Sequence, residues 1–250
     1  VEWIKNFFEG KINHTTWQRI TKEEYDKLPN DKRMISEGTT NDYKKKVVVT
    51  SKDIDGLYLI TKHDGLPTLE LLKMCKEKGI PLKIHFSITT LGHTNFEKGV
   101  MESDELLKRI GDYIDMGYLD PNDVTLRVDP IVPDVTNFGT GAEGEKNTVH
   151  NIFKFAQQKG IKQIKFSILD YYPEGMTIGG KNGNELIPEL KEVLTKAGQN
   201  PNDYFETKYG KDNNGNIKKD ANQFIKDSIA AKMIELRDYY ATDDYCAKLI

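Results

Sequence analysis

Polar and charged side chains stand at the ends of four short apolar segments in this chain of 250 residues. Arg127 and Asp129 lie two positions apart in the third segment, so the alternation of a strand would put both on one face. A partly buried pair of opposite charges is costly unless it is well satisfied, which makes it a candidate for binding or catalysis. The same two residues could also form a structural ion pair. The other candidates at segment ends are Lys62, Ser87, Thr89 and Tyr171.

A metal site is a further possibility for these polar groups. Asp129 and Asp170, together with His85 or His63, have the side chains that suit zinc or manganese in a metal-dependent barrel hydrolase. The chain has no His-x-His pair at a segment end, so this hypothesis ranks behind the others. The remaining histidines are interpreted as surface or loop residues: His14, His93 and His150.

The four apolar segments are predicted strands, each followed by a helical segment that ends at a glycine. The strands are expected over residues 57–61, 82–89, 124–132 and 163–170, and the glycines are Gly79, Gly117, Gly160 and Gly198. Strands that alternate with helices predict an α/β fold with a parallel sheet. Four consecutive strand–helix units favour a full or partial (β/α) barrel over an open sheet, and the strand ends would then converge on one rim.

Three regions are expected along the chain. Residues 1–46 form an N-terminal helical and irregular region, residues 47–200 form the barrel core, and residues 201–250 form a polar excursion followed by a helix. Ser103 is the predicted N-cap of the second core helix. The polar segment 207–219 is predicted to form a hairpin or turn rather than a calcium loop.

Composition excludes several classes of protein. The net charge of −3 argues against a mainly electrostatic nucleic-acid binder, and 10% aromatic residues is too rich for a disordered chain. No apolar run approaches the roughly 20 residues of a membrane span. Two cysteines cannot build a disulfide framework, which fits a reducing, cytoplasmic location.

A series of short motifs resembles one enzyme family. Their order and spacing are similar to the central half of the spore photoproduct lyase-like branch of the radical S-adenosylmethionine (SAM) superfamily. The resemblance covers roughly residues 55–175. The motifs are Leu59-Ile60-Thr61-Lys62, Ile84-His85-Phe86-Ser87-Ile88-Thr89, Asn95-Phe96-Glu97-Lys98-Gly99, Leu107-Lys108-Arg109-Ile110, Arg127-Val128-Asp129-Pro130-Ile131 and Ser167-Ile168-Leu169-Asp170-Tyr171-Tyr172.

This resemblance implies a fold, two cofactors and a set of roles. The fold would be a partial (β/α)6 barrel of the radical SAM type, with SAM and a [4Fe–4S] iron–sulfur cluster at the strand ends. A 5′-deoxyadenosyl radical would act on a small-molecule substrate, a nucleotide or a nucleic acid. By this resemblance Lys62, Ser87, Thr89 and Arg127 would bind SAM. Asp129 and Tyr171 would act in catalysis, Tyr171 as a hydrogen-atom relay or a stacking surface for the substrate.

The cysteines depart from the family pattern. Radical SAM enzymes hold the cluster with three cysteines, usually spaced C-x-x-x-C-x-x-C, whereas this chain contains only Cys75 and Cys246. Two expectations follow. Either the cluster ligands lie outside these 250 residues, or the chain is a degenerate barrel without a cluster that serves as a binding or assembly module.

Overall fold

The fold was analysed in a computed structural model that describes residues 2–35, 43–62, 69–89, 100–138, 149–172, 177–178, 181–182 and 187–250. The chain divides into two compact units. The first comprises Val1–Leu57 and Thr68–Leu82, and the second comprises Tyr58–Pro67 and Lys83–Ile250. The predicted site residues belong to the second unit.

Within its described residues, the first unit contains a small antiparallel sheet, three α-helices and two short 3-10 helices. Its strands β1 (His14–Arg19), β3 (Tyr43–Val49) and β2 (Arg33–Ile35) pair in that order. Helix α2 (Lys22–Asp26) begins at a capping box in which Thr21 and Glu24 bond to each other's backbone. The longer helices of this unit are α1 (Glu2–Phe8) and α3 (Leu69–Lys78), joined by an ion pair between Lys5 and Glu70.

The second unit is built on the predicted parallel strands. Each is formed close to its expected bounds, as β4 (Leu57–Thr61), β5 (Leu82–Ile88), β6 (Val124–Ile131) and β7 (Gln163–Ile168). The sheet has the order β10-β7-β6-β5-β4, so consecutive strands of the chain are neighbours in the sheet. The α/β class and the parallel sheet are confirmed. Among the described strands the sheet has two edges, at β4 and at β10 (Lys248–Leu249).

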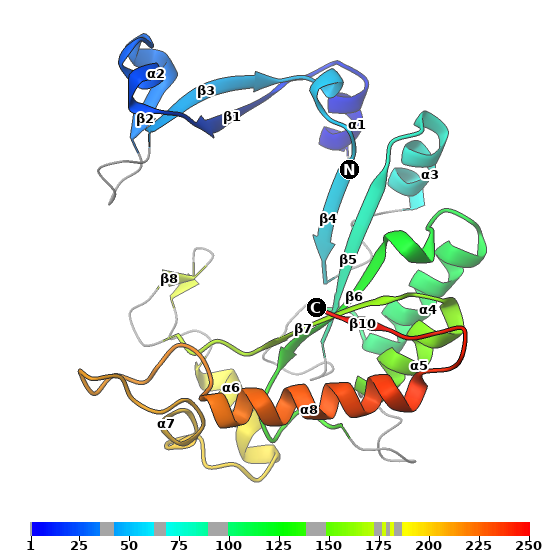
Figure 1. Ribbon diagram of the computed structural model, residues 1–250, viewed down its shortest axis with the longest axis vertical. Coiled ribbons are helices and arrows are strands. Elements are labelled where there is room, and N and C mark those ends of the chain that lie inside the picture. The colour runs from blue at the N-terminus through cyan, green and yellow to red at the C-terminus, as the bar shows by residue number, and fades with distance from the viewer. Residues whose placement is uncertain are drawn as a thin grey trace. The chain divides into compact units, whose positions relative to one another are not determined.

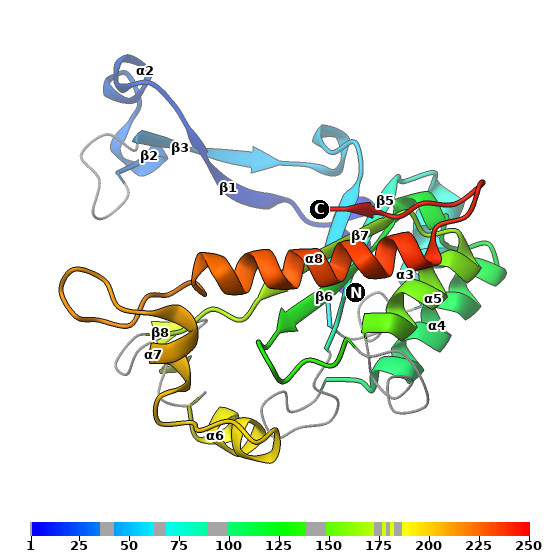
Figure 2. The same ribbon diagram turned by 60° about the horizontal axis from the view of Figure 1, so that its bottom comes forward.

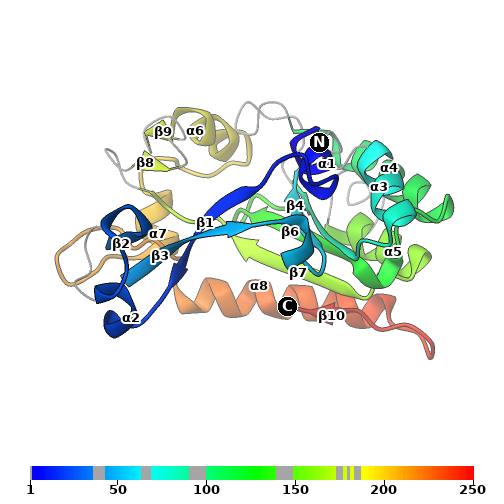
Figure 3. The ribbon, with the colours of Figure 1, turned by 90° about the horizontal axis from the view of Figure 1, so that it is seen from above.

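Helices α4 (Ser103–Asp115) and α5 (Val149–Lys159) cover one face of β5, β6 and β7 (Figures 1 and 3). Apolar strand residues face these helices and are completely buried, Phe86 and Leu126 among them. Burying these side chains is the main favourable contribution to folding in this unit. The glycines that follow the helices have a positive φ, for instance 70° at Gly160, as expected for residues that end helices.

Two local expectations are wrong. Ser103 is not the N-cap of α4, because Glu102 holds that position. The Ser103 hydroxyl instead donates to the backbone carbonyl of Thr89, 2.6 Å away and buried. His150 is not on the surface, because its α5 face is covered by the long helix α8 (Gln223–Tyr240), and its ring lies 2.7 Å from the Tyr240 hydroxyl.

The C-terminal part of the chain packs beyond the ends of β6 and β7. Helices α6 (Ile187–Lys196) and α7 (Tyr204–Tyr209) contribute to a second apolar cluster that also includes Val132 and Leu169. The predicted hairpin follows, with Lys211 bridged to Ile217. Helix α8 then contacts α5 and β10 (Figure 2). Within the described residues no helix combines the length and apolar character needed to cross a membrane.

Candidate functional site

The sheet face opposite α4 and α5 is polar because β5, β6 and β7 alternate apolar and polar residues. Parallel pairing in register arranges these polar residues in rows across the sheet. One row contains His85, Thr125 and Gln163, with the Thr125 hydroxyl donating to the Gln163 side chain. The next row contains Ser87, Arg127 and Lys165. We call the side chains of these two rows, together with Asp129 and Ser167, the polar face.

Asp129 holds the most constrained charge of the polar face. One of its carboxylate oxygens lies 3.0 Å from the Arg127 guanidinium, and the other accepts a 2.6 Å hydrogen bond from the Ser167 hydroxyl. Both charged side chains are largely shielded, with 20% and 22% of their surface exposed. The expected pairing of Arg127 with Asp129 is therefore formed, and both oxygens of the carboxylate have protein donors.

Lys165 adds a second positive charge beside Arg127. The two residues are register partners on β6 and β7, and strands in a sheet are about 4.8 Å apart. In the part of the chain that the structure describes, no carboxylate pairs with Lys165, whereas Arg127 has Asp129. Like charges placed side by side on a sheet are unfavourable, so this row offers a place for an anionic group.

The environment of His85 reflects this excess of positive charge. Its ring lies 2.9 Å from the Tyr58 hydroxyl at the edge of the polar face. Burial lowers the pKa of His85, and the charges of Arg127 and Lys165 lower it further. The neutral imidazole is thus the favoured form.

Three of the six predicted site residues share the polar face, namely Ser87, Arg127 and Asp129. Thr89 is buried just beyond β5, where its carbonyl fixes the start of α4. Lys62 is half-buried directly after β4. Both lie at the carboxyl ends of their strands, the edge where α/β sheets bind ligands.

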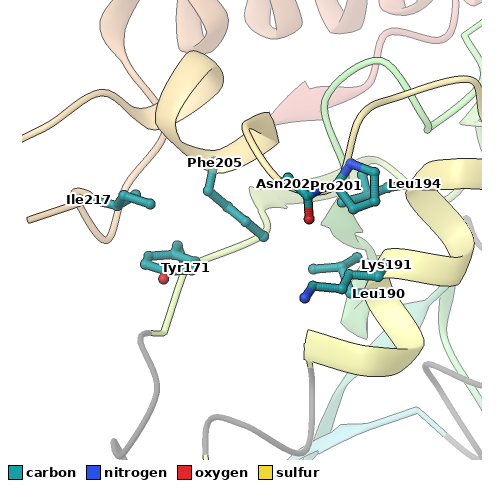
Figure 4. Close-up of a pocket in the computed structure, with 8 residues that line it drawn as sticks. All are labelled: Tyr171, Leu190, Lys191, Leu194, Pro201, Asn202, Phe205 and Ile217. Carbon is teal, nitrogen blue, oxygen red and sulfur yellow. The ribbon is translucent and has the colours of Figure 1, made fainter.

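Tyr171 lies in a different environment from the other candidates. Its ring packs on Phe205 with centroids 4.5 Å apart, and its backbone N–H donates to the Lys219 carbonyl. The ring lines a cavity of about 170 Å³ beyond the end of β7, shown in Figure 4. No contact within the described residues joins Tyr171 to Asp129.

The two aspartates suggested for a metal site have other partners. Asp170 is paired with Lys219 at 3.0 Å and accepts a hydrogen bond from Tyr172. Asp129 is held by Arg127 and Ser167. Among the described residues no three histidine, cysteine or carboxylate side chains gather into a possible metal site, and His63 lies outside that part of the chain.

Sequence reasoning overlooked Lys165 and the pocket residues Lys191 and Phe205. Lys165 could have been found, because it alternates with Ile164 and Phe166 in a strand that had been identified. Phe205 carries no such signal, since its role depends on the packing of a six-residue helix that was not predicted.

Comparisons with protein-family models, with curated proteins and with solved structures found no match to this chain. The candidate site therefore has to be interpreted from its own chemistry.

Proposed function

We propose that the polar face binds the amino-acid end of a small molecule, and that this molecule is SAM. The observation that carries the proposal is the row of Ser87, Arg127 and Lys165 beside Asp129. An α-amino acid presents a carboxylate and an ammonium group close together. A site for it needs a cation and an anion at a similar spacing, which adjacent rows of a sheet provide.

Each group of such a ligand has a suitable partner. The ligand carboxylate would accept hydrogen bonds from Lys165 and from the Ser87 hydroxyl, which offsets the repulsion between Lys165 and Arg127. The ammonium group would donate to Asp129, whose carboxylate can accept more bonds than the two it receives from the protein. Charged hydrogen bonds of this kind contribute about 1.5–3 kcal/mol each.

The strand order supports the barrel that the family resemblance implies. In a (β/α) barrel, consecutive parallel strands are neighbours, the helices cover the outer face, and the inner face lines the site. Here β4, β5, β6 and β7 follow this order, and α4 and α5 lie opposite the polar face. We therefore interpret the sheet as part of a (β/α)6 barrel whose inner surface is the polar face.

The residues of this chain do not fit the [4Fe–4S] cluster. Its two cysteines are one fewer than the three ligands required. Cys75 is buried on α3, where burial raises the pKa of its thiol, and Cys246 is exposed on another unit of the chain. We derive no radical step, and the proposal concerns binding. Such a chain would be a binding module for SAM without a cluster.

Titration calorimetry with SAM tests the proposal. S-adenosylhomocysteine keeps the amino-acid end, whereas 5′-methylthioadenosine lacks it. We expect SAM and S-adenosylhomocysteine to bind. Methylthioadenosine should bind at least tenfold more weakly, because it loses one or more charged hydrogen bonds. Equal binding of all three compounds, or of none, would contradict the proposal.

Substitutions identify the surface that is involved. Lys165→Gln should weaken SAM binding about tenfold, which corresponds to the loss of one charged hydrogen bond. Lys154→Gln is the matched control, because Lys154 is an exposed lysine on α5, on the other side of the sheet. An equal effect of the two substitutions would show that SAM binds elsewhere.

A further inference from the structure

The cavity beyond β7 is a separate, largely apolar site. Its walls come from α6, the following turn, α7 and the hairpin, and its lining consists of Tyr171, Leu190, Lys191, Leu194, Pro201, Asn202, Phe205 and Ile217. The floor belongs to the second apolar cluster, in which Leu190 and Leu194 are buried. Buried tyrosines hold α7 in place, since Tyr204 donates to the Pro133 carbonyl and Tyr209 to the Leu169 carbonyl. The cavity is thus supported by fixed elements.

The size of the cavity matches one aromatic ring. Its volume is about 170 Å³. An apolar cavity of about 150 Å³ in another protein accepts benzene, so a single six-membered ring can be accommodated here.

The walls are suited to the faces and edges of such a ring. Tyr171 and Phe205 form a tilted pair with an angle of 38° between their planes, and both are only half-buried. Aromatic rings prefer offset or edge-to-face contacts with one another, which a third ring could make with this pair. The opposite wall is aliphatic, formed by Leu190 and Leu194 (Figure 4).

A positively charged side chain stands at the cavity. Lys191 is exposed on α6, and Figure 4 shows its amino group turned towards the space facing Tyr171. The neighbouring Glu192 is paired with Lys196. Within the described residues, neither the Lys191 amino group nor the Asn202 side-chain amide has a hydrogen-bond partner. Both can therefore bind an oxygen atom of a ligand.

We infer that this cavity binds a monocyclic aromatic anion, with the ring between the Tyr171–Phe205 pair and α6 and the anionic group on Lys191. An aromatic carboxylic acid and a pyrimidine nucleotide share this chemistry. The inference is independent of SAM binding, because it uses none of the residues of the polar face.

Ligand titration followed by the amide NMR signals of the full chain tests this site. Phenylacetate should shift the signals of Leu194 and Phe205 saturably and leave those of Ser87 and Arg127 unchanged. Cyclohexylacetate, which has the charge without the aromatic ring, should bind at least threefold more weakly. Benzyl alcohol, which has the ring without the charge, should also bind at least threefold more weakly. Equal affinities for the three compounds, or no saturable shift, would overturn the inference.

Substitutions at Lys191 separate the charge from the fold. Lys191→Gln should weaken phenylacetate binding about threefold to fivefold, the range expected for one exposed ion pair, and leave benzyl alcohol binding unchanged. Lys196→Gln is the control, because this lysine is on the same helix and is paired with Glu192. The inference fails if Lys191→Gln has no effect on phenylacetate or if Lys196→Gln has the same effect.

The aromatic pair is tested with two variants, because a single substitution next to the second apolar cluster can unfold it. Phe205→Leu and Tyr171→Leu should each abolish the preference for phenylacetate over cyclohexylacetate while the rest of the amide spectrum is retained. Retention of that preference in either folded variant would overturn the inference. Uridine monophosphate distinguishes the two sources. Tighter binding than phenylacetate assigns the site to a pyrimidine nucleotide, and weaker binding assigns it to an aromatic acid.

Discussion

Individual residues of the polar face are constrained by their neighbours more than by their own type. Asp129 is oriented by Arg127 and Ser167 from two strands, so its carboxylate has a defined position before any ligand arrives. Lys165 is different, because its register partner on β6, Arg127, is also a cation. A site with one satisfied ion pair and one excess cation is preorganised for a ligand that brings its own negative charge.

The titration of His85 reports this excess charge. Burial and the two nearby cations lower its pKa in the folded protein. The folded state therefore favours the neutral ring, and stability is lost as the pH falls below the unfolded value of about 6.5 towards the lower folded pKa. We predict that Lys165→Gln raises the pKa of His85, because one of the cations is removed.

An NMR titration of the His85 ring protons measures this pKa in both proteins. Lys154→Gln is again the control and should leave the value unchanged. A pKa of His85 that is the same with and without Lys165 would mean that the lysine points away from the polar face.

At the scale of elements, a hydrogen bond from Ser103 joins α4 to β5, although the sequence predicts that this side chain caps the helix. Ser103 is buried at the start of α4 and donates to the carbonyl of Thr89 at the end of β5. Its hydroxyl acts as a donor, whereas an N-cap side chain acts as an acceptor. The two roles differ in which substitutions they tolerate.

We predict that Ser103→Ala lowers the free energy of unfolding by about 1–3 kcal/mol, because the buried carbonyl of Thr89 loses its donor. Ser103→Asp should be at least as destabilising, since an ionised carboxylate cannot donate, and Ser103→Thr should retain most of the stability. Denaturant unfolding of the three variants measures the order. A stable Ser103→Asp variant would instead support the N-cap.

The helices and strands were largely predictable from sequence, whereas the elements that each of them packs against were not. Alternation identified β5 and β6, and glycines marked the ends of α4 and α5, because these signals are local. The two-residue strand β10 gives no periodic signal, and its pairing with β7 depends on distant residues. For the site, strand alternation put Arg127 and Asp129 on one face, whereas the separate position of Tyr171 depends on the packing of α7.

At the scale of the whole molecule, the two units differ in how much of their backbone is shielded. Every residue of β1 is exposed, whereas β5 and β6 contribute completely buried side chains such as Ile84 and Val128. Backbone hydrogen bonds open more readily where few apolar side chains cover them.

We predict that hydrogen–deuterium exchange will be at least tenfold faster for the amides of β1 and β3 than for those of β5 and β6. This factor corresponds to a difference of about 1.4 kcal/mol in opening free energy. Mass spectrometry of the exchanging full chain measures it, with β5 and β6 as an internal pair expected to exchange alike. Equal protection of β1 and β6 would contradict the prediction.

The sheet order also has a consequence for the time course of folding. Strands β4 to β7 are neighbours both in the chain and in the sheet, so each is joined to the one before it by a shorter connection than the one from β7 to β10. By contrast, β10 pairs with β7, and Tyr245 just before it donates to Ile161, 84 positions earlier in the chain. Contacts of such long range require a large loop to close and form slowly. The central strands should therefore assemble first. The outer edge of β7 would stay unpaired until β10 is added, and it is the last part of the sheet to be covered.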